Sequence, residues 1–223
     1  SRIYAYPSIA AYEILASQDS TYLTLAGQLH ELESIPVSTE SINHDVAAIQ
    51  AFFTVGKALI FSEEKVDEYI QKWHEELLSK GISQNQLDRS IEYAQMVSDH
   101  IMDWANGDNY AQTRMFEKFT ITEDSSRWQP TPPAYMEAIE PHWNKMRTFV
   151  IDSGQQFIPV PPTPFDINEE SVFFKEMKEV YEVGLNLSEE QSEIASFWDC
   201  NPYVMNVRGH VMFATKKITP GGH

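Results

Sequence analysis

A proline-dense band in the second half of the chain limits what this sequence can fold into. Eight of the twelve prolines lie between Pro130 and Pro164. Proline lacks a backbone N–H and its ring clashes with the preceding turn, so neither a continuous helix nor a central strand fits there. Large apolar side chains are interleaved with these prolines: Trp128, Tyr135, Trp143, Phe149 and Phe157. A flexible linker carries few such groups, and we therefore expect residues 120–165 to form an ordered strap over helices, with a short helix near 134–139.

The clearest helical pattern lies before this strap, between residues 62 and 106. Ser62 caps a first segment whose apolar residues fall on one face: Val66, Tyr69, Ile70, Trp73 and Leu77. Lys80 and Gly81 supply a cationic last turn and a left-handed stop. Ser83 with Gln86 forms a capping box for a second helix, which carries apolar residues at helical spacing as far as Trp104. The short junction predicts an antiparallel helical hairpin.

Further helices are predicted along the rest of the chain. One covers residues 2–17, with Pro7 near its start or at a kink; a second candidate covers 22–32; a third runs from a cap at Ser41 or Asn43 to about 60. Others cover 169–183, ended by Gly184, then a segment opened by Ser188 and Gln191 and running through Trp198, and finally 203–217. No alternating run indicates a sheet. The sequence predicts an all-α bundle of about six to eight helices, in a single helical domain over residues 1–223.

The charge balance and the cysteine count exclude several classes of protein. The net charge is −17, and an acidic surface repels phosphate backbones and anionic lipid headgroups, so nucleic acid is not an expected partner. No apolar run approaches the length of a transmembrane segment. Cys200 is the only cysteine, which excludes an intrachain disulfide and a cysteine-rich metal site. The chain begins without Met and ends on Pro-Gly-Gly-His, so we expect it to be part of a longer protein.

Spacing alone does not reveal an active site. Asp99, His100 and Asp103 bring possible metal ligands onto one helix, but they are interpreted as a solvated face because His100 sits to one side of the other two. Cys200, with His210 ten residues along, is interpreted as a packed residue rather than a nucleophile. The sequence contains neither a Gly-x-Ser-x-Gly elbow nor a phosphate-binding loop. An acid pair for glycoside hydrolysis remains open, since such pairs assemble across space.

Several stretches, taken in order, resemble one family. Residues 127–135 read Arg-Trp-Gln-Pro-Thr-Pro-Pro-Ala-Tyr, followed by Glu-Pro-His-Trp at 140–143 and Arg-Thr-Phe at 147–149. This resembles the Trp-x-Pro-Thr-Pro-Pro strap of vanadium-dependent haloperoxidases, which share a helical-bundle fold with the type 2 phosphatidic acid phosphatase superfamily. The segments 157–164, 176–184 and 190–198 resemble the family's chain after that strap, residues 218–223 resemble a Thr-Pro-Pro-Gly-His turn, and residues 1–6 fit the first helix.

The resemblance implies a role but not a complete site. In the family, vanadate or phosphate is held by Lys-x6-Arg-Pro, Pro-Ser-Gly-His and Ser-Arg-x5-His, and this chain contains none of them. Two Arg and a Lys neutralise the anion there. We therefore expect no catalytic, cofactor or metal residue in this chain, with Trp198, His210 and His223 as candidates only for supporting positions. The resemblance implies that the parent protein is either a phosphatase, which is a hydrolase, or a haloperoxidase, which is an oxidoreductase. It also implies that the parent is periplasmic or is a secreted protein or lipoprotein.

Two alternatives stay open. In the first, the chain is a non-enzymatic helical module whose strap forms a groove for a partner. In the second, it is a hydrolase with an unrecognised acid pair. If it is instead the N-terminal part of the implied parent, its missing partner is the C-terminal half of the same protein. We then expect an uncovered apolar face, which would also allow a homo-oligomer.

Overall fold

The computed structural model describes residues 2–60, 63–132, 134–199, 203–208 and 211–216. The chain divides into two compact units. Unit 1 comprises residues 1–116 and 142–157, and unit 2 comprises 117–141 and 158–223. The expectation of a single domain over 1–223 stays a prediction. None of the helices in the described part of the chain has the length and apolar character that a bilayer-spanning segment needs.

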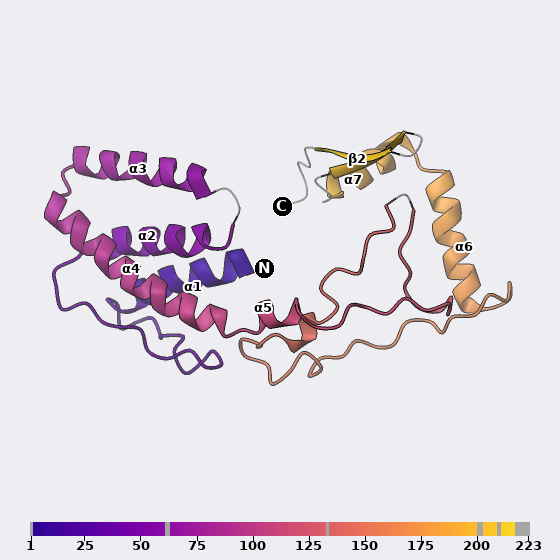
Figure 1. Cartoon of the computed structure of the whole chain (residues 1–223), viewed down its shortest axis with the longest axis horizontal. Helices are drawn as coiled ribbons and strands as arrows, with labels where there is room; N and C mark the ends of the chain where they lie inside the picture. Colours follow the sequence, from indigo (N-terminus) through magenta and orange to yellow (C-terminus); the bar gives the residue numbers. More distant parts are fainter. Residues whose placement is uncertain (1, 61–62, 133, 200–202, 209–210, 217–223) are drawn as a thin grey trace. The chain divides into compact units, whose positions relative to one another are not determined.

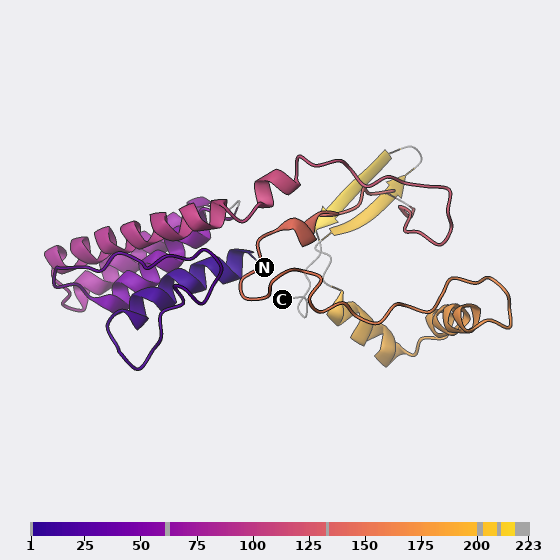
Figure 2. The same cartoon turned by 90° about the horizontal axis from the view of Figure 1, so that it is seen from below.

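Unit 1 is a helical bundle, as expected. Its helices are α1 (Arg2–Ala16), α2 (His44–Lys57), α3 (Glu63–Ser79), α4 (Gln84–Asn106) and the short α5 (Tyr110–Thr113). Helices α1, α2 and α4 pack against one another, and α3 packs on α2 and α4 (Figures 1 and 2). Their inward faces form the core, which includes the fully buried Ala10, Ile14, Ala51, Val97 and Ile101. The many alanines allow the helices to approach closely.

The helix boundaries follow local capping chemistry. The Asn43 side chain accepts a hydrogen bond from the Val46 N–H, and Ser83 accepts one from Gln86. Between α3 and α4, Gly81 adopts φ +101°. Its N–H donates to the Leu78 carbonyl at 3.1 Å, while the Ile82 N–H donates to the Leu77 carbonyl at 3.2 Å. These two bonds define a Schellman stop, and the predicted helical hairpin is confirmed.

The predicted helix over residues 22–32 is wrong. This stretch is a loop that tertiary hydrogen bonds hold in place. Glu13 of α1, only 2% exposed, accepts hydrogen bonds from the Leu25 N–H and the Thr24 hydroxyl, both at 2.6 Å. Gly27 and Glu31 adopt positive φ, which a right-handed helix does not allow. Leu32 then returns to the core at 3% exposure.

The strap is irregular, as its prolines require, but only part of it belongs to the helical bundle. Residues 142–157 lie in unit 1, where Phe149 packs against the core. The short helix expected near 134–139 is absent from the described backbone there; Tyr135 has φ 47° and the helical turn lies instead at η1, a 3₁₀ turn over Trp143–Lys145. Residues 117–141 belong to unit 2. The packing of aromatic residues over helices is therefore confirmed for 142–157.

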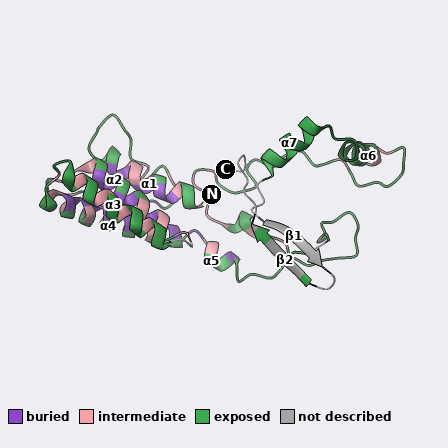
Figure 3. Cartoon of the chain, turned by 90° about the horizontal axis from the view of Figure 1, so that it is seen from above, coloured by how far each residue is buried: buried purple, intermediate pink, exposed green. Residues whose placement is uncertain are grey.

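Unit 2 contains α6 (Val172–Leu185), α7 (Glu189–Trp198) and an antiparallel pair, β1 (Tyr203–Arg208) and β2 (Val211–Lys216). The expectation that Gly184 ends the first of these helices is wrong, because α6 continues through it to Leu185. The predicted capping box of Ser188 and Gln191 is present. Neither α6 nor α7 has a buried residue, and neither ribbon carries purple in Figure 3. An amphipathic helix gains most of its stability when its apolar face packs against another element.

The helix expected over residues 203–217 is wrong, because β1 and β2 occupy that stretch. The register runs from Tyr203 opposite Lys216 to Arg208 opposite Val211. Both segments are rich in β-branched and aromatic residues and are separated by two residues beginning with Gly209, a pattern typical of a hairpin. Apart from this hairpin, the elements that the structure describes are helical, which confirms the helical fold class.

Candidate functional site

The most concentrated polar chemistry of unit 1 lies at the carboxyl end of α4, around Asp108. This carboxylate is 1% exposed. Its Oδ2 accepts hydrogen bonds from Arg2 Nε at 2.8 Å and from the Tyr6 hydroxyl at 2.7 Å, and its Oδ1 accepts one from the Tyr110 N–H at 2.9 Å. Arg2 also donates to the Ala105 carbonyl at 3.2 Å. One buried carboxylate thus joins the start of α1 to the end of α4 and to α5.

A second arginine, from the strap, reaches the same helix end. Arg147 donates through its side chain to the Trp104 carbonyl at 2.8 Å and to Glu31 at 3.1 Å, and its backbone N–H donates to the Asp108 carbonyl at 2.9 Å. Its guanidinium carbon lies 4.5 Å from the centre of the Trp104 ring, a cation–π distance. Arg147 Nε is buried and meets no acceptor among the described residues. The two arginines therefore cap carbonyls at the negative end of α4.

Three aromatic rings close the cluster on its core side. The Tyr6 ring stands edge-on to Trp104 at 5.3 Å and to Phe149 at 5.8 Å. Burial, followed by the hydrogen bond to Asp108 and the negative charge of that carboxylate, raises the pKa of Tyr6 from 10.0 to about 12. Tyr6 therefore stays protonated as a hydrogen-bond donor at neutral pH.

The described residues around this cluster do not fit vanadate or phosphate. An oxyanion needs cations and N–H donors that are free to face it. Here Arg2 is paired with Asp108, Arg147 is paired with Glu31, and both contact helix carbonyls. An anion placed here would meet Asp108 and the negative end of α4. The contacts of the cluster join helix ends and the strap, which is a structural role.

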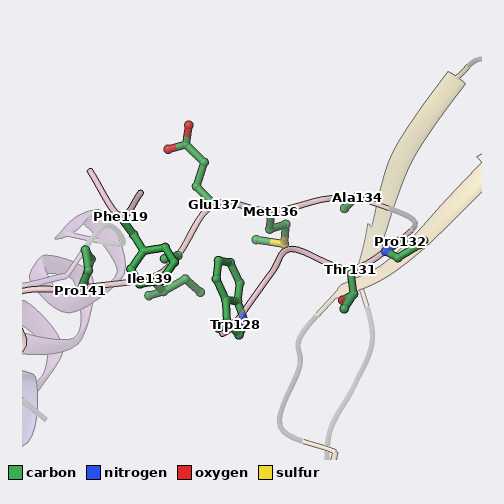
Figure 4. A pocket seen from close by; sticks show the side chains of 10 residues that line it. Phe119, Trp128, Thr131, Pro132, Ala134, Met136, Glu137, Ile139 and Pro141 are labelled. Carbon is green, nitrogen blue, oxygen red and sulfur yellow. The ribbon is translucent and has the colours of Figure 1, made fainter. Parts of the chain in front are cut away.

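A second feature is an open apolar groove in the first half of the strap, within unit 2. It has a volume of about 660 Å³ and is lined mainly by Phe119, Trp128, Met136 and Ile139 with neighbouring prolines. Figure 4 shows these apolar side chains around a common space, with the Glu137 carboxylate pointing away from it. Glu137 instead pairs with Lys118 at 2.9 Å. Such a lining can bind an apolar group; its polar side chains are Thr131 and the ion-paired Glu137.

Of the candidates named from the sequence, Trp198 lies within the described part of the chain. Trp198 lies at the end of α7, is 66% exposed, and contacts the Phe197 ring at 5.3 Å. His210, His223 and Cys200 lie outside the described residues. Trp198 therefore keeps its supporting role only as a prediction.

The possible helical metal ligands are engaged in ordinary contacts. Asp99 accepts a hydrogen bond from Gln95 at 2.7 Å, and the His100 ring lies 3.1 Å from the Glu33 carbonyl. Within the part of the chain that the structure describes, no group of three or more His, Cys, Asp or Glu residues is placed to hold a metal ion.

Sequence reasoning missed Asp108 and Tyr6, which the structure places at the centre of the buried cluster. They are separated by more than a hundred positions, so no local spacing links them. One local signal could have indicated Asp108. It follows Asn106-Gly107 at the end of a long amphipathic helix, and a carboxylate at that end is unfavourable unless a cation accompanies it.

Comparison with known proteins identifies a relative among the solved structures. No protein-family model matches the chain, and no curated protein matches it. Among solved structures, the chain is similar to the crystal structure of the first bacterial vanadium-dependent iodoperoxidase, with 48% sequence identity and a TM-score of 0.84. The match covers 91% of this chain and 50% of the iodoperoxidase chain, so this chain spans about half the length of that relative. In sequence and in fold, the chain is therefore similar to about one half of a vanadium-dependent iodoperoxidase.

Proposed function

We propose that this chain is the scaffold part of a longer enzyme that oxidises iodide with hydrogen peroxide at bound vanadate. The observation that carries the proposal is the 48% identity to an iodoperoxidase over 91% of the chain. Vanadate would supply peroxide activation when bound. The groups that hold it would come from the part of the longer protein that lies outside these residues.

The proposed role of this chain is positional. The cluster of Asp108, Arg2 and Arg147 fixes the start of α1 and residues 142–157 of the strap to the end of α4. Because the anchoring groups are buried and paired, they hold the bundle wall in one arrangement. A rigid wall of this kind supports a site built on adjoining elements.

The test is an iodide oxidation assay on two proteins, the 223-residue chain and the longer protein that contains it. Each is supplied with vanadate, hydrogen peroxide and iodide, and triiodide formation is followed by absorbance. We expect turnover from the longer protein and none above the buffer rate from the chain alone. Turnover by the chain alone would contradict the scaffold role. A longer protein that is inactive with iodide but hydrolyses a chromogenic phosphate ester would favour the phosphatase alternative.

A non-enzymatic binding role is a second candidate, favoured by the groove of Phe119, Trp128, Met136 and Ile139. Its apolar, proline-rich lining fits an apolar segment of a partner. A longer protein that shows neither oxidation nor ester hydrolysis would favour this candidate over the enzyme. We also propose that the longer protein is periplasmic or secreted, which fractionation of the native host would test.

A further inference from the structure

A second apolar groove lies on unit 1, on the side of α1 and α2 turned away from the core. It has a volume of about 360 Å³ and is lined by Ala11 and Leu15 of α1 with Asp45, Ala48, Ile49 and Phe52 of α2. The two alanines are small, and Ala48 is buried, so they form its floor. Leu15, Ile49 and Phe52 rise beside them and are 36%, 43% and 40% exposed.

The spacing of these residues matches what a packed helix requires. Asp45, Ile49 and Phe52 recur at intervals of four and three along α2, and Ala11 and Leu15 are four apart on α1. Each set therefore forms a ridge along one face of its helix. The opposite faces of α1 and α2 are already buried in the core, through Ala10, Ile14, Ala47 and Ala51. Helices that are apolar on both sides are normally covered on both sides.

We propose that this α1–α2 groove receives an amphipathic helix from the part of the same longer protein that lies outside these 223 residues. The proposal rests on the proposed function in one respect, because it requires the longer protein. It does not depend on whether that protein oxidises iodide. The matched relative has as much chain outside the match as within it, since the match covers 50% of its length. That length is sufficient to supply several helices.

Charge favours this occupant over a second copy of the chain. Each copy has a net charge of −17, and pairing two identical grooves would bring two Asp45 carboxylates toward one apolar interface. Like charges in such an interface are costly. A helix from elsewhere in the protein avoids this cost and can place a lysine or arginine opposite Asp45. The expected occupant is therefore an apolar helical face with a basic residue near one end.

Thiol labelling tests the proposal. Cysteine is introduced as Ile49→Cys, and separately as Leu15→Cys, in a Cys200→Ser background, in both the 223-residue chain and the longer protein. The control is Met96→Cys on α4, because Met96 is 44% exposed and does not line the groove. Modification by a maleimide is timed at each site by peptide mass spectrometry.

In the chain alone, we expect the groove positions and the control to react at similar rates. In the longer protein, we expect at least tenfold slower labelling at positions 49 and 15 and an unchanged rate at 96. Undiminished labelling in the longer protein would overturn the proposal, as would equal slowing at the control. Slowing in the chain alone that grows with its concentration would identify a second copy as the occupant and would also overturn it. Protection of the groove in a longer protein that oxidises no iodide would uphold the docking surface while refuting the reaction.

Discussion

Replacing the buried carboxylate of Asp108 by an amide should destabilise the helical bundle strongly. Asp108→Asn keeps the size of the side chain but removes the charge that Arg2 faces at 2.8 Å, and it can turn an N–H₂ group toward donors. Removing one partner of a buried ion pair typically costs about 3–5 kcal/mol. Arg2 retains 18% side-chain exposure, so water can partly solvate it. We therefore expect a loss near the lower end, about 3 kcal/mol.

The assay is urea unfolding of the 223-residue chain, followed by tryptophan fluorescence. For a chain of this size, a loss of about 3 kcal/mol also corresponds to a fall in Tm of roughly 6–12 °C. The matched control is Asp99→Asn, whose carboxylate is exposed and accepts one hydrogen bond, from Gln95; it should change stability by less than about 0.5 kcal/mol. If Asp108→Asn stays within about 1 kcal/mol of the parent chain, the cluster does not anchor the fold.

Single residues elsewhere in the bundle and in α6 give the remaining predictions. Folding raises the pKa of Tyr6 from 10.0 to about 12, so the unfolded chain loses this proton at a lower pH than the folded chain does. The contribution of Tyr6 to the free energy of unfolding should therefore be complete below pH 10. It should fall by up to about 2.7 kcal/mol as the pH rises toward 12. Tyr6→Phe should flatten that part of a pH series of urea midpoints. Ile101→Ala, at a fully buried position, should cost about 3 kcal/mol in the same measurement, and a cost under 1 kcal/mol would show a loosely packed core. Gly81→Ala should cost about 1 kcal/mol because Gly81 has φ +101°. Gly184→Ala should raise the helicity measured by circular dichroism. Gly184 lies inside α6, and beyond the helix's own backbone no atom lies within 4 Å of the added Cβ.

The parts of the fold that sequence could predict are those with local causes. The α3–α4 hairpin depends on Gly81 and Ser83, which act within a few residues of their positions. The box of Ser188 and Gln191 likewise forms where it was expected. The irregular backbone of the strap could be predicted because proline has no backbone N–H to donate to a helix or a sheet.

The parts that failed depend on distant contacts or on a weak local signal. Residues 22–32 carry enough apolar side chains for a helix, but Glu13 captures the Thr24 hydroxyl and the Leu25 N–H and holds a loop instead. The β1–β2 hairpin was missed because the apolar residues of 203–217 were interpreted as helically spaced. The β-branched residues on either side of Gly209 were the local signal that favoured strands.

The candidate site shows the same division. The absence of the oxyanion motifs could be read directly from the sequence. The partners of Arg2 and Arg147 could not, since Arg2 meets Asp108 and Arg147 meets Glu31 across more than a hundred positions of chain each. Only the folded structure shows that these two cations are already engaged.

Vanadate binding tests most directly whether the oxyanion chemistry lies outside this chain. Equilibrium dialysis with vanadate is performed on the 223-residue chain and on the longer protein, with phosphate as competitor. We expect saturable binding near one vanadate per molecule for the longer protein and no saturable binding for the chain alone. Saturable binding of one vanadate by the 223-residue chain, displaced by phosphate, would contradict the scaffold role.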